Sequence, residues 1–79
     1  MKKALHYIVS SIVTNPEKVV VDEQELDGVI NFTITVAGED MGKIIGKNGK
    51  VIRSIRNVMK IPAIKQNKKI NVVLFESSS

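Results

Sequence analysis

The stretch IIGKNGKVIRSI, residues 44–55, constrains the fold more than any other part of this sequence. Two glycines, Gly46 and Gly49, stand three positions apart with Lys47 and Asn48 between them, and apolar pairs lie on both sides. The apolar residues after the tetrad recur at helical spacing. Two short helices joined by four residues need a sharp turn, for which glycine supplies the backbone freedom. The stretch therefore predicts two helices that meet at a glycine turn.

The first half of the chain predicts one helix and two strands. Apolar pairs that recur every four residues favour a helix over residues 2–13, which Asn15-Pro16 ends because the residue before a proline avoids the helical region. β-Branching favours a strand at residues 18–23, and clean alternation of apolar and polar residues predicts another at 29–37. The Asp-Gly pair in ELDG, residues 25–28, predicts a turn that joins the two strands into an antiparallel hairpin.

The second half predicts two helices and a last strand. A short helix over residues 40–45 precedes the glycine tetrad, and the next helix begins near Lys50. Pro62 is expected to end or kink that helix near Lys60, although the helical pattern could continue beyond the kink to Gln66. Two further segments complete the order: a polar loop, KQNKK, at residues 65–69, and a strand at residues 70–75.

The length and the element order predict one α+β domain. With 79 residues there is room for a single core, which we place at residues 1–76 with a disordered tail at 77–79. The order α-β-β-α-α-β predicts a three-stranded sheet with the helices packed on one face. The chain has no cysteine, which excludes disulfides and metal sites with thiolate ligands. One histidine is too few for a histidine-based metal site, and we expect no cofactor. A domain this small gains from a partner, and a second copy is one candidate.

Neither a targeting segment nor a membrane span is expected. The N-terminal lysines and apolar residues are interrupted by polar side chains, and no small-residue cleavage site follows them. No apolar run approaches the length that crosses a bilayer. We therefore expect a cytoplasmic protein that makes no contact with a membrane.

The charge is divided unevenly along the chain. Residues 1–40 hold three lysines and seven acids, a net charge of −4, whereas residues 41–79 hold nine lysines or arginines and one acid, a net charge of +8. A cationic half-chain suggests a polyanion as partner, because clustered lysine and arginine release phosphate counterions. A solvated basic surface is the alternative, and charge alone does not decide between the two.

The GKNG tetrad is suited to a phosphodiester backbone. The spacing matches neither the P-loop nor the dinucleotide-binding fingerprint, so nucleotide hydrolysis and dehydrogenation have no support. Glycines let a sugar-phosphate backbone approach closely, and the helix that follows directs its free N–H groups and positive dipole end towards the turn. Lys47, Lys43 and Lys50 add positive charge, and Asn48 can donate a hydrogen bond.

The stretch IIGKNGKVIRSI resembles the core of KH domains, (I/V)-I-G-x-x-G-x-x-I-x-x-I, and the element order resembles the type II KH fold of bacterial proteins. The longer stretch AGEDMGKIIGKNGKVIRSIRNVMK is similar to the small stand-alone bacterial KH proteins of the KhpA family. The resemblance covers the whole chain. Pro62 departs from it, because the family would have an unbroken helix at this position.

The resemblance implies a protein that binds single-stranded RNA in a groove and acts as an RNA chaperone or post-transcriptional regulator linked to cell elongation and division. One wall of the groove would be the two helices and the glycine loop; the other would be a sheet edge and the loop after the second helix. The implied contacts are Gly46, Lys47, Asn48, Gly49, Lys43, Lys50 and Arg53, with Lys65, Lys68 and Lys69 on the opposite lip. The family also implies a homodimer, or pairing with a larger KH protein of the KhpB (Jag) type.

Two isoleucines favour a protein interface. If the helix continues past Pro62, Ile61 and Ile64 lie away from its apolar stripe, and exposed apolar residues are typical of interfaces. Alternatively, Pro62 redirects the chain and both side chains return to the core.

An interaction module or a ribosome-associated assembly factor, in which the KH fold docks a protein, is the competing function. No catalytic set is visible, so we do not expect an enzyme. The residues leave open whether RNA or single-stranded DNA is bound.

Overall fold

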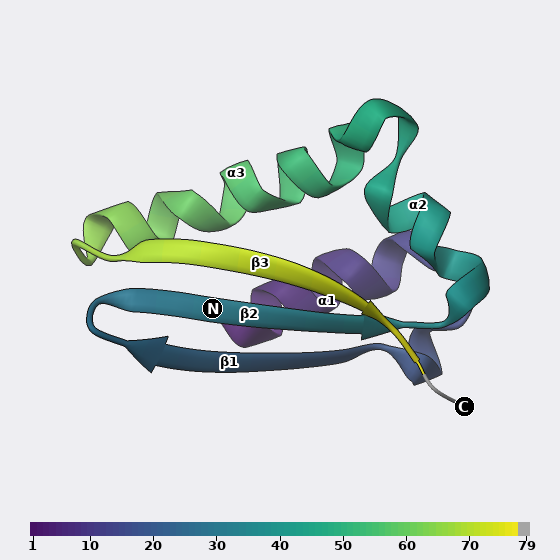
Figure 1. The fold of residues 1–79 in the computed structure, drawn as a ribbon, viewed down its shortest axis with the longest axis horizontal. Coiled ribbons are helices and arrows are strands. Elements are labelled where there is room, and N and C mark those ends of the chain that lie inside the picture. Colours follow the sequence, from purple (N-terminus) through teal and green to yellow (C-terminus); the bar gives the residue numbers. More distant parts are fainter. Residues whose placement is uncertain (78–79) are drawn as a thin grey trace.

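The computed structural model describes residues 1–77 as three helices and one three-stranded sheet. Residues 78–79, within the expected tail, lie outside the described residues, and the backbone N–H of Ser77 donates a hydrogen bond to the carbonyl of Val36. Figure 1 shows the sheet with α3 above it and α1 behind it. The elements are α1 (Lys2–Ile12), β1 (Val20–Leu26), β2 (Val29–Val36), α2 (Met41–Ile45), α3 (Lys50–Lys65) and β3 (Lys69–Glu76).

The sheet is mixed, with the order β1-β2-β3. β1 and β2 form the expected antiparallel hairpin, joined by Asp27 and Gly28, both with positive φ as a tight two-residue hairpin turn requires. β3 pairs with β2 in parallel, Ile30 lying opposite Ile70. Parallel neighbours need a long crossover, and α2 and α3 provide it. The predicted fold class, α+β with the helices on one face, is confirmed.

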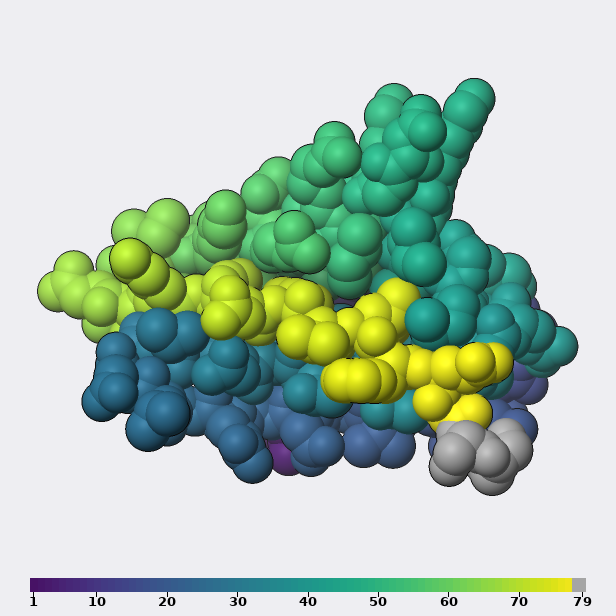
Figure 2. Space-filling model, in the orientation of Figure 1, coloured from purple at the N-terminus to yellow at the C-terminus, as the bar shows by residue number. Residues whose placement is uncertain are grey.

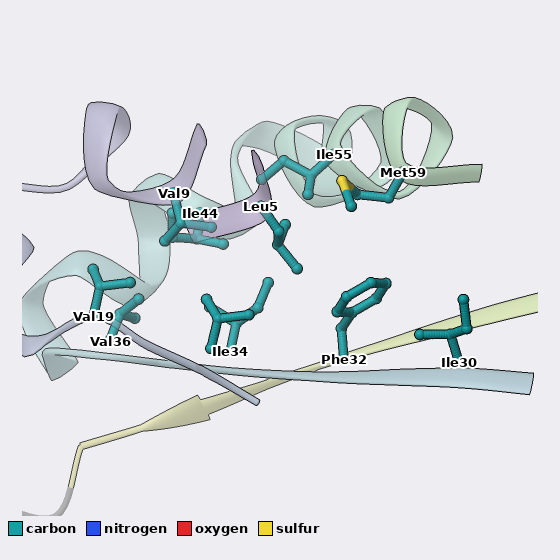
Figure 3. Packing of buried hydrophobic residues seen from close by; sticks show 11 residues of the cluster. Leu5, Val9, Val19, Ile30, Phe32, Ile34, Val36, Ile44, Ile55 and Met59 are labelled. Carbon is teal, nitrogen blue, oxygen red and sulfur yellow. The ribbon is translucent and has the colours of Figure 1, made fainter. Parts of the chain in front are cut away.

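The core lies between the helices and one face of the sheet, as Figure 3 shows. Alternate residues of β2 point into it, so the period-two pattern seen in the sequence is the burial pattern of the strand. α1 contributes two fully buried residues one helical turn apart. The principal buried side chains are Leu5, Val9, Ile30, Phe32, Ile34, Val36, Ile44, Ile55 and Met59.

Several predicted element boundaries differ from the observed ones. β1 begins at Val20 because Pro16–Lys18 form a short 3-10 turn, for which the fixed φ of proline is suited. KQNKK is only partly a loop, since Lys65 ends α3 and Lys69 begins β3. The structure also decides between the two alternatives for Pro62.

Pro62 does not end α3 near Lys60, because the helix continues to Lys65 and Gln66 is its C-cap. The alternative in which the helical pattern runs on past the proline to Gln66 is therefore confirmed to within one residue. Ala63, directly after the proline, is buried, and its carbonyl accepts hydrogen bonds from the backbone N–H groups of Gln66 and Lys68. Burial and these closing bonds therefore hold the last turn, although Pro62 itself cannot donate one.

Candidate nucleic-acid interface

The GKNG tetrad forms a short turn that projects from the body of the protein. Lys47–Gly49 are a single 3-10 turn between α2 and α3, closed by a hydrogen bond of 3.2 Å from the N–H of Gly49 to the carbonyl of Gly46. In Figure 2 this teal-green segment stands furthest from the sheet. Both Lys47 and Asn48 are exposed at its tip. The predicted glycine turn between two helices is confirmed.

The two glycines of the tetrad meet different constraints. Gly46 has φ 73° and ψ 176°, and a Cβ placed there would lie 2.4 Å from Val51 Cγ2 and 2.9 Å from the backbone nitrogen of Val51. Gly49 has φ 73° and ψ 18°, and the nearest atom to a Cβ placed there is Arg53 Nη2 at 4.0 Å. Gly46 is therefore required by the packing of the turn, whereas the outer side of Gly49 is open to a ligand.

The N-terminus of α3 has no side-chain cap. Gly49 occupies the N-cap position in a left-handed conformation and has no side chain with which to accept a bond from the first turn. The first N–H groups of a helix lack partners within it, and its dipole places a partial positive charge there. Lys47 and Lys50 lie on either side of this end. The arrangement suits an anion such as a backbone phosphate.

Arg53 braces the turn from the first turns of α3. Its Nη2 donates a hydrogen bond of 3.2 Å to the backbone carbonyl of Asn48, although the residue remains exposed. Asn48 itself has φ 57° and ψ 26°, the left-handed region that asparagine adopts more readily than most residues. The guanidinium thus holds the tip in one conformation while still adding positive charge beside it.

The side chain of Lys43, on α2, contacts residues next to the end of α1. Its Nζ donates to Thr14 Oγ1 and lies 3.8 Å from Asp40 Oδ1. Asp40 is fully buried, and its two carboxylate oxygens accept the backbone N–H groups of Thr14 and Asn15 at 2.9 Å each. Lys43 is therefore tied to the end of α1 and is a weaker candidate for RNA contact than its place in the sequence indicated.

Asp40 joins the end of α1 to the start of α2. Burial alone would raise the pKa of this carboxyl, but the hydrogen bonds from Thr14 and Asn15 outweigh it and lower the pKa to about 2. The carboxylate is therefore charged throughout the neutral range. Because α2 leads directly into the GKNG turn, Asp40 helps to fix the direction of that turn, a role not apparent from the sequence.

The two flanks of α3 differ in chemistry. On one flank, a groove of about 300 Å³ between α1 and α3 is lined by Ile8, Ile12, Lys50, Val51, Ser54, Ile55 and Val58. On the other flank, Lys60 lines a hollow with Ile70 of β3. Arg53 and Arg56 lie seven and four positions before Lys60, so they share its side of the helix. The flank towards β3 is therefore basic, and the flank towards α1 is mainly apolar.

The basic residues of α3 are divided between its two flanks. Lys50 lies on the α1 flank, in the apolar groove. Arg56 and Lys60, absent from the contacts inferred from the sequence, lie on the β3 flank. The spacing of four residues between Arg56 and Lys60 can be read from the sequence. Which side of α3 faces β3 cannot, because it depends on the parallel pairing of β3 with β2.

The KQNKK lysines lie at the end of α3 remote from GKNG. Lys68 Nζ is 2.7 Å from Glu25 Oε1, and the N–H of Lys69 donates to the carbonyl of Gly28 in the hairpin turn. Lys65 follows Val58 by seven positions and so shares the α1 flank. The structure places Lys68 and Lys69 beside the β1–β2 hairpin and Lys65 on the α1 flank. Their place on the opposite lip of an RNA groove, which the family resemblance implies, stays a prediction.

Ile61 and Ile64 do not return to the core. Their exposed fractions are 58% and 68%. α3 continues past Pro62, so both point away from its buried stripe. The alternative in which Pro62 buries them is therefore wrong, while their role as an interface stays a prediction.

Two further findings concern the part of the chain that the structure describes. Within residues 1–77, no group of three or more His, Cys, Asp or Glu side chains is placed to hold a metal ion. None of the described helices is both long and apolar enough to span a membrane.

Comparisons with known proteins agree with the fold. The family model of the KhpA/KhpB KH domain matches residues 2–74. The RNA-binding protein KhpA of Clostridium perfringens is 44% identical over 72 residues, covering 91% of this chain and 96% of that protein. The proteins of the same name from Chlamydia trachomatis and Listeria monocytogenes are 40% and 34% identical over 76 residues, covering 96% of this chain and 97% and 100% of theirs.

Proposed function

This chain belongs to the KhpA/KhpB family of KH domains, and on that premise we propose that it binds single-stranded RNA and holds a short segment through its GKNG turn. The observation that carries the proposal is the geometry of the turn. Lys47 and Asn48 are exposed at its tip, the outer side of Gly49 is open, and the uncapped start of α3 lies directly behind. KH loops of this kind clamp about four nucleotides of backbone.

The proposed groove runs between α3 and β3. Ile70, Val72 and Leu74 of β3 are half-buried and offer an aliphatic floor, while Arg53 and Arg56 line the α3 side. Aromatic side chains are scarce, so binding relies on phosphate contacts and shape more than on base stacking. A 2′-hydroxyl contact would favour RNA over single-stranded DNA.

We propose a binding protein without catalytic activity. Asp40, the one buried ionisable side chain in residues 1–77, is occupied by the backbone of Thr14 and Asn15 and lies away from the tip of GKNG. His6, the single histidine, has Ser10 as its hydrogen-bond partner on an exposed face of α1. Neither group is placed for acid–base chemistry at the proposed groove.

The cellular role that we propose rests on family membership. It is that of a cytoplasmic RNA chaperone or post-transcriptional regulator with a broad set of RNAs, linked to control of cell elongation and division. Pairing with itself or with a larger KH protein of the KhpB type belongs to the same proposal. The exposed Ile61 and Ile64 support such pairing.

Fluorescence anisotropy with short single-stranded RNAs tests the proposed function. The comparison is between the wild type and Lys47→Asp/Asn48→Asp, which places two negative charges at the tip and leaves both glycines unchanged. We expect the wild type to bind with a steep salt dependence and the variant to lose binding, with circular dichroism confirming that the variant folds. Equal binding by the two proteins would show that the tetrad is only a turn. The same titration with single-stranded DNA measures the preference for RNA.

Docking of a protein partner is the second candidate function. The same two isoleucines favour it, because they leave an apolar surface on α3 beyond the proposed groove. An absence of nucleic-acid binding by the wild type would favour this alternative, and co-sedimentation with ribosomal subunits would test its ribosome-associated form.

A further inference from the structure

The tip of the GKNG turn carries the groups that take part in spontaneous deamidation. Asn48 is the one asparagine of the sequence that a glycine follows. Because Gly49 has no side chain, its backbone nitrogen can approach the side-chain carboxamide of Asn48 more closely than the nitrogen of a bulkier residue. Asn48 is exposed, and within residues 1–77 its side-chain amide makes no hydrogen bond. The carboxamide is therefore open to attack by the backbone that follows it.

The reaction joins atoms of these adjacent residues. The backbone nitrogen of Gly49 loses its proton to water and attacks the side-chain carbonyl carbon of Asn48. A C–N bond forms, the bond to the side-chain nitrogen breaks, and that nitrogen takes a proton from water and leaves as ammonia. Water then opens the cyclic succinimide at either of its carbonyl groups, which gives aspartate or isoaspartate. The residues of the turn and water supply every atom of this sequence.

The folded turn holds the reacting atoms apart. At a ψ of 26°, the nitrogen of Gly49 lies on the opposite side of the Cα–C bond of Asn48 from Cβ, whereas ring closure needs both on the same side. The N–H of Gly49 donates a hydrogen bond of 3.2 Å to the carbonyl of Gly46. Arg53 Nη2 donates another, also 3.2 Å long, to the carbonyl of Asn48. Rotation of ψ at Asn48 breaks both bonds, so the turn must open before the ring can close.

Opening of this turn is a local event. None of the residues Lys47–Gly49 is buried, and in Figure 2 the segment stands furthest from the sheet. Segments with few buried contacts open at a small fraction of the free energy of global unfolding. Within residues 1–77, the bond from Arg53 is the one side-chain hydrogen bond to residues 47–49. Arg53 therefore governs how often the turn opens.

We propose that Asn48 is a site of spontaneous deamidation, that Arg53 protects it by keeping the turn closed, and that its conversion weakens the hold of GKNG on RNA. The last part rests on the proposed function. Aspartate or isoaspartate places a carboxylate beside Lys47 at the tip, where it repels a backbone phosphate. Bound RNA, in turn, holds the turn closed and slows the conversion.

The rate of deamidation tests the site without RNA. The wild type, Arg53→Gln and a synthetic peptide of residues 45–51 are incubated at mildly alkaline pH. Peptide mass mapping follows the mass rise of about one dalton at Asn48, with a protease that does not cut at lysine so that the turn stays in one peptide. Circular dichroism checks that each protein is folded.

The chain offers two controls for this measurement. Arg56→Gln removes the same charge from the same flank of α3, and within residues 1–77 the Arg56 side chain makes no hydrogen bond. Asn67 is the internal control, because it is also exposed and left-handed, with φ 58°, but is followed by Lys68 in place of a glycine. The first control separates the hydrogen bond of Arg53 from its charge, and the second separates the following glycine from the backbone conformation.

We expect the peptide to convert fastest, because it has no folded turn to open. Arg53→Gln should convert at Asn48 about threefold to tenfold faster than the wild type, as the loss of one hydrogen bond implies. Arg56→Gln should stay within about twofold of the wild type. Asn67 should remain unconverted over the same period in all three proteins.

The effect on RNA is measured on the converted protein, which cation-exchange chromatography separates because its net positive charge is lower. By fluorescence anisotropy it should bind a short single-stranded RNA on the order of tenfold more weakly than the wild type at low salt. Saturating RNA should slow the conversion of the wild type.

Distinct results would overturn each part. Equal rates for Arg53→Gln and the wild type would exclude protection by Arg53. No conversion at Asn48 in Arg53→Gln, or equally fast conversion at Asn67, would exclude the site. Unchanged binding by the converted protein would refute the effect on RNA. If the wild type bound no RNA at all, the proposed function would fail, whereas the rates would still decide on Asn48 and Arg53.

Discussion

Gly46 and Gly49 share a φ of 73°, yet the structure assigns them different tasks. At Gly46 the backbone conformation is one that only glycine adopts readily, and Val51 fills the space beside it. At Gly49 the conformation is left-handed and the space outside it is open. The first glycine builds the turn, and the second leaves room for the ligand that we propose.

Alanine substitutions separate these two tasks. We expect Gly46→Ala to lower the free energy of unfolding by about 3 kcal/mol, because the new methyl group meets Val51 and the backbone is strained. Gly49→Ala should cost only about 1 kcal/mol, the ordinary cost of a left-handed residue with a side chain. Urea denaturation of both variants measures the difference. Equal losses would contradict the division of roles.

Asp40 predicts a specific acid sensitivity. Its folded pKa, about 2, lies below the ordinary value of 3.8, so its contribution to stability is complete above pH 3.8 and is lost as the pH falls towards 2. We expect Asp40→Asn to melt at a lower temperature than the wild type at neutral pH. Below about pH 4 the two melting temperatures should converge.

Thermal unfolding followed by circular dichroism between about pH 7 and pH 2 measures this convergence. A difference in melting temperature that stays constant down to pH 2 would show that the charge of Asp40 does not stabilise the fold. Lys43→Met is a useful companion variant, since it removes the neighbouring cation and leaves the hydrogen bonds from Thr14 and Asn15 in place.

Sequence reasoning at the residue scale was reliable for the tip of the turn and less so for its surroundings. The exposure of Lys47 and Asn48 follows from local turn chemistry. The attachment of Lys43 to Thr14 spans 29 positions and depends on how α1 packs, so no local pattern contains it. Arg56 was missed for a related reason, because its side of α3 matters only once β3 lies beside it.

At the scale of elements, α3 shows how tertiary packing outweighs a local helix breaker. Pro62 removes one helical hydrogen bond, and its ring crowds the carbonyl four residues earlier. Met59 and Ala63, on either side of it, are buried against the sheet and hold the helix through the proline. The lost hydrogen bond at Pro62 can be predicted from the sequence, but the burial of Met59 and Ala63 that offsets it cannot.

Pro62→Ala should therefore stabilise the protein. Alanine restores the missing N–H donor and relieves the crowding, and the loss of the half-buried ring offsets part of that gain. We expect the free energy of unfolding to rise by about 1–2 kcal/mol, measured by urea denaturation. Unchanged or reduced stability would mean that the ring makes packing contacts worth as much as the restored hydrogen bond.

The sheet was predictable only in part. Alternation identifies the buried face of β2, and an Asp-Gly pair identifies the hairpin, because both signals are local. The parallel pairing of β3 with β2 joins residues 40 positions apart, such as Ile30 and Ile70. Nothing in either strand specifies that partner, so the sheet order needed the structure.

At the scale of the molecule, the charge asymmetry of the sequence becomes a spatial one. Asp22 and Glu23 of β1 lie on the strand at the far edge of the sheet from β3, whereas Glu25, further along β1, pairs with Lys68. The cations of α3 lie at the opposite side, as Figure 1 shows by the positions of β1 and α3. A polyanion is therefore repelled from one edge and attracted to the other.

The exposed isoleucines predict self-association. If Ile61 and Ile64 form a homodimer interface, size-exclusion chromatography with light scattering at tens of micromolar should give twice the monomer mass, about 17 kDa for an 8.7 kDa chain. Ile61→Asp should shift the protein to the monomer without unfolding it, because Ile61 is 58% exposed. A wild-type monomer at that concentration would rule out a homodimer formed through these two isoleucines.

An NMR titration of ¹⁵N-labelled protein with a single-stranded RNA of about four nucleotides tests whether GKNG holds the RNA backbone. We expect the largest amide shifts to fall on Gly46 to Val51 and to continue along the β3 flank of α3 at Arg53 and Arg56. Residues of the α1 flank, such as Ile8 and Val58, should change little. Shifts concentrated on the α1 flank or on the uncovered face of the sheet, with GKNG unaffected, would contradict this expectation.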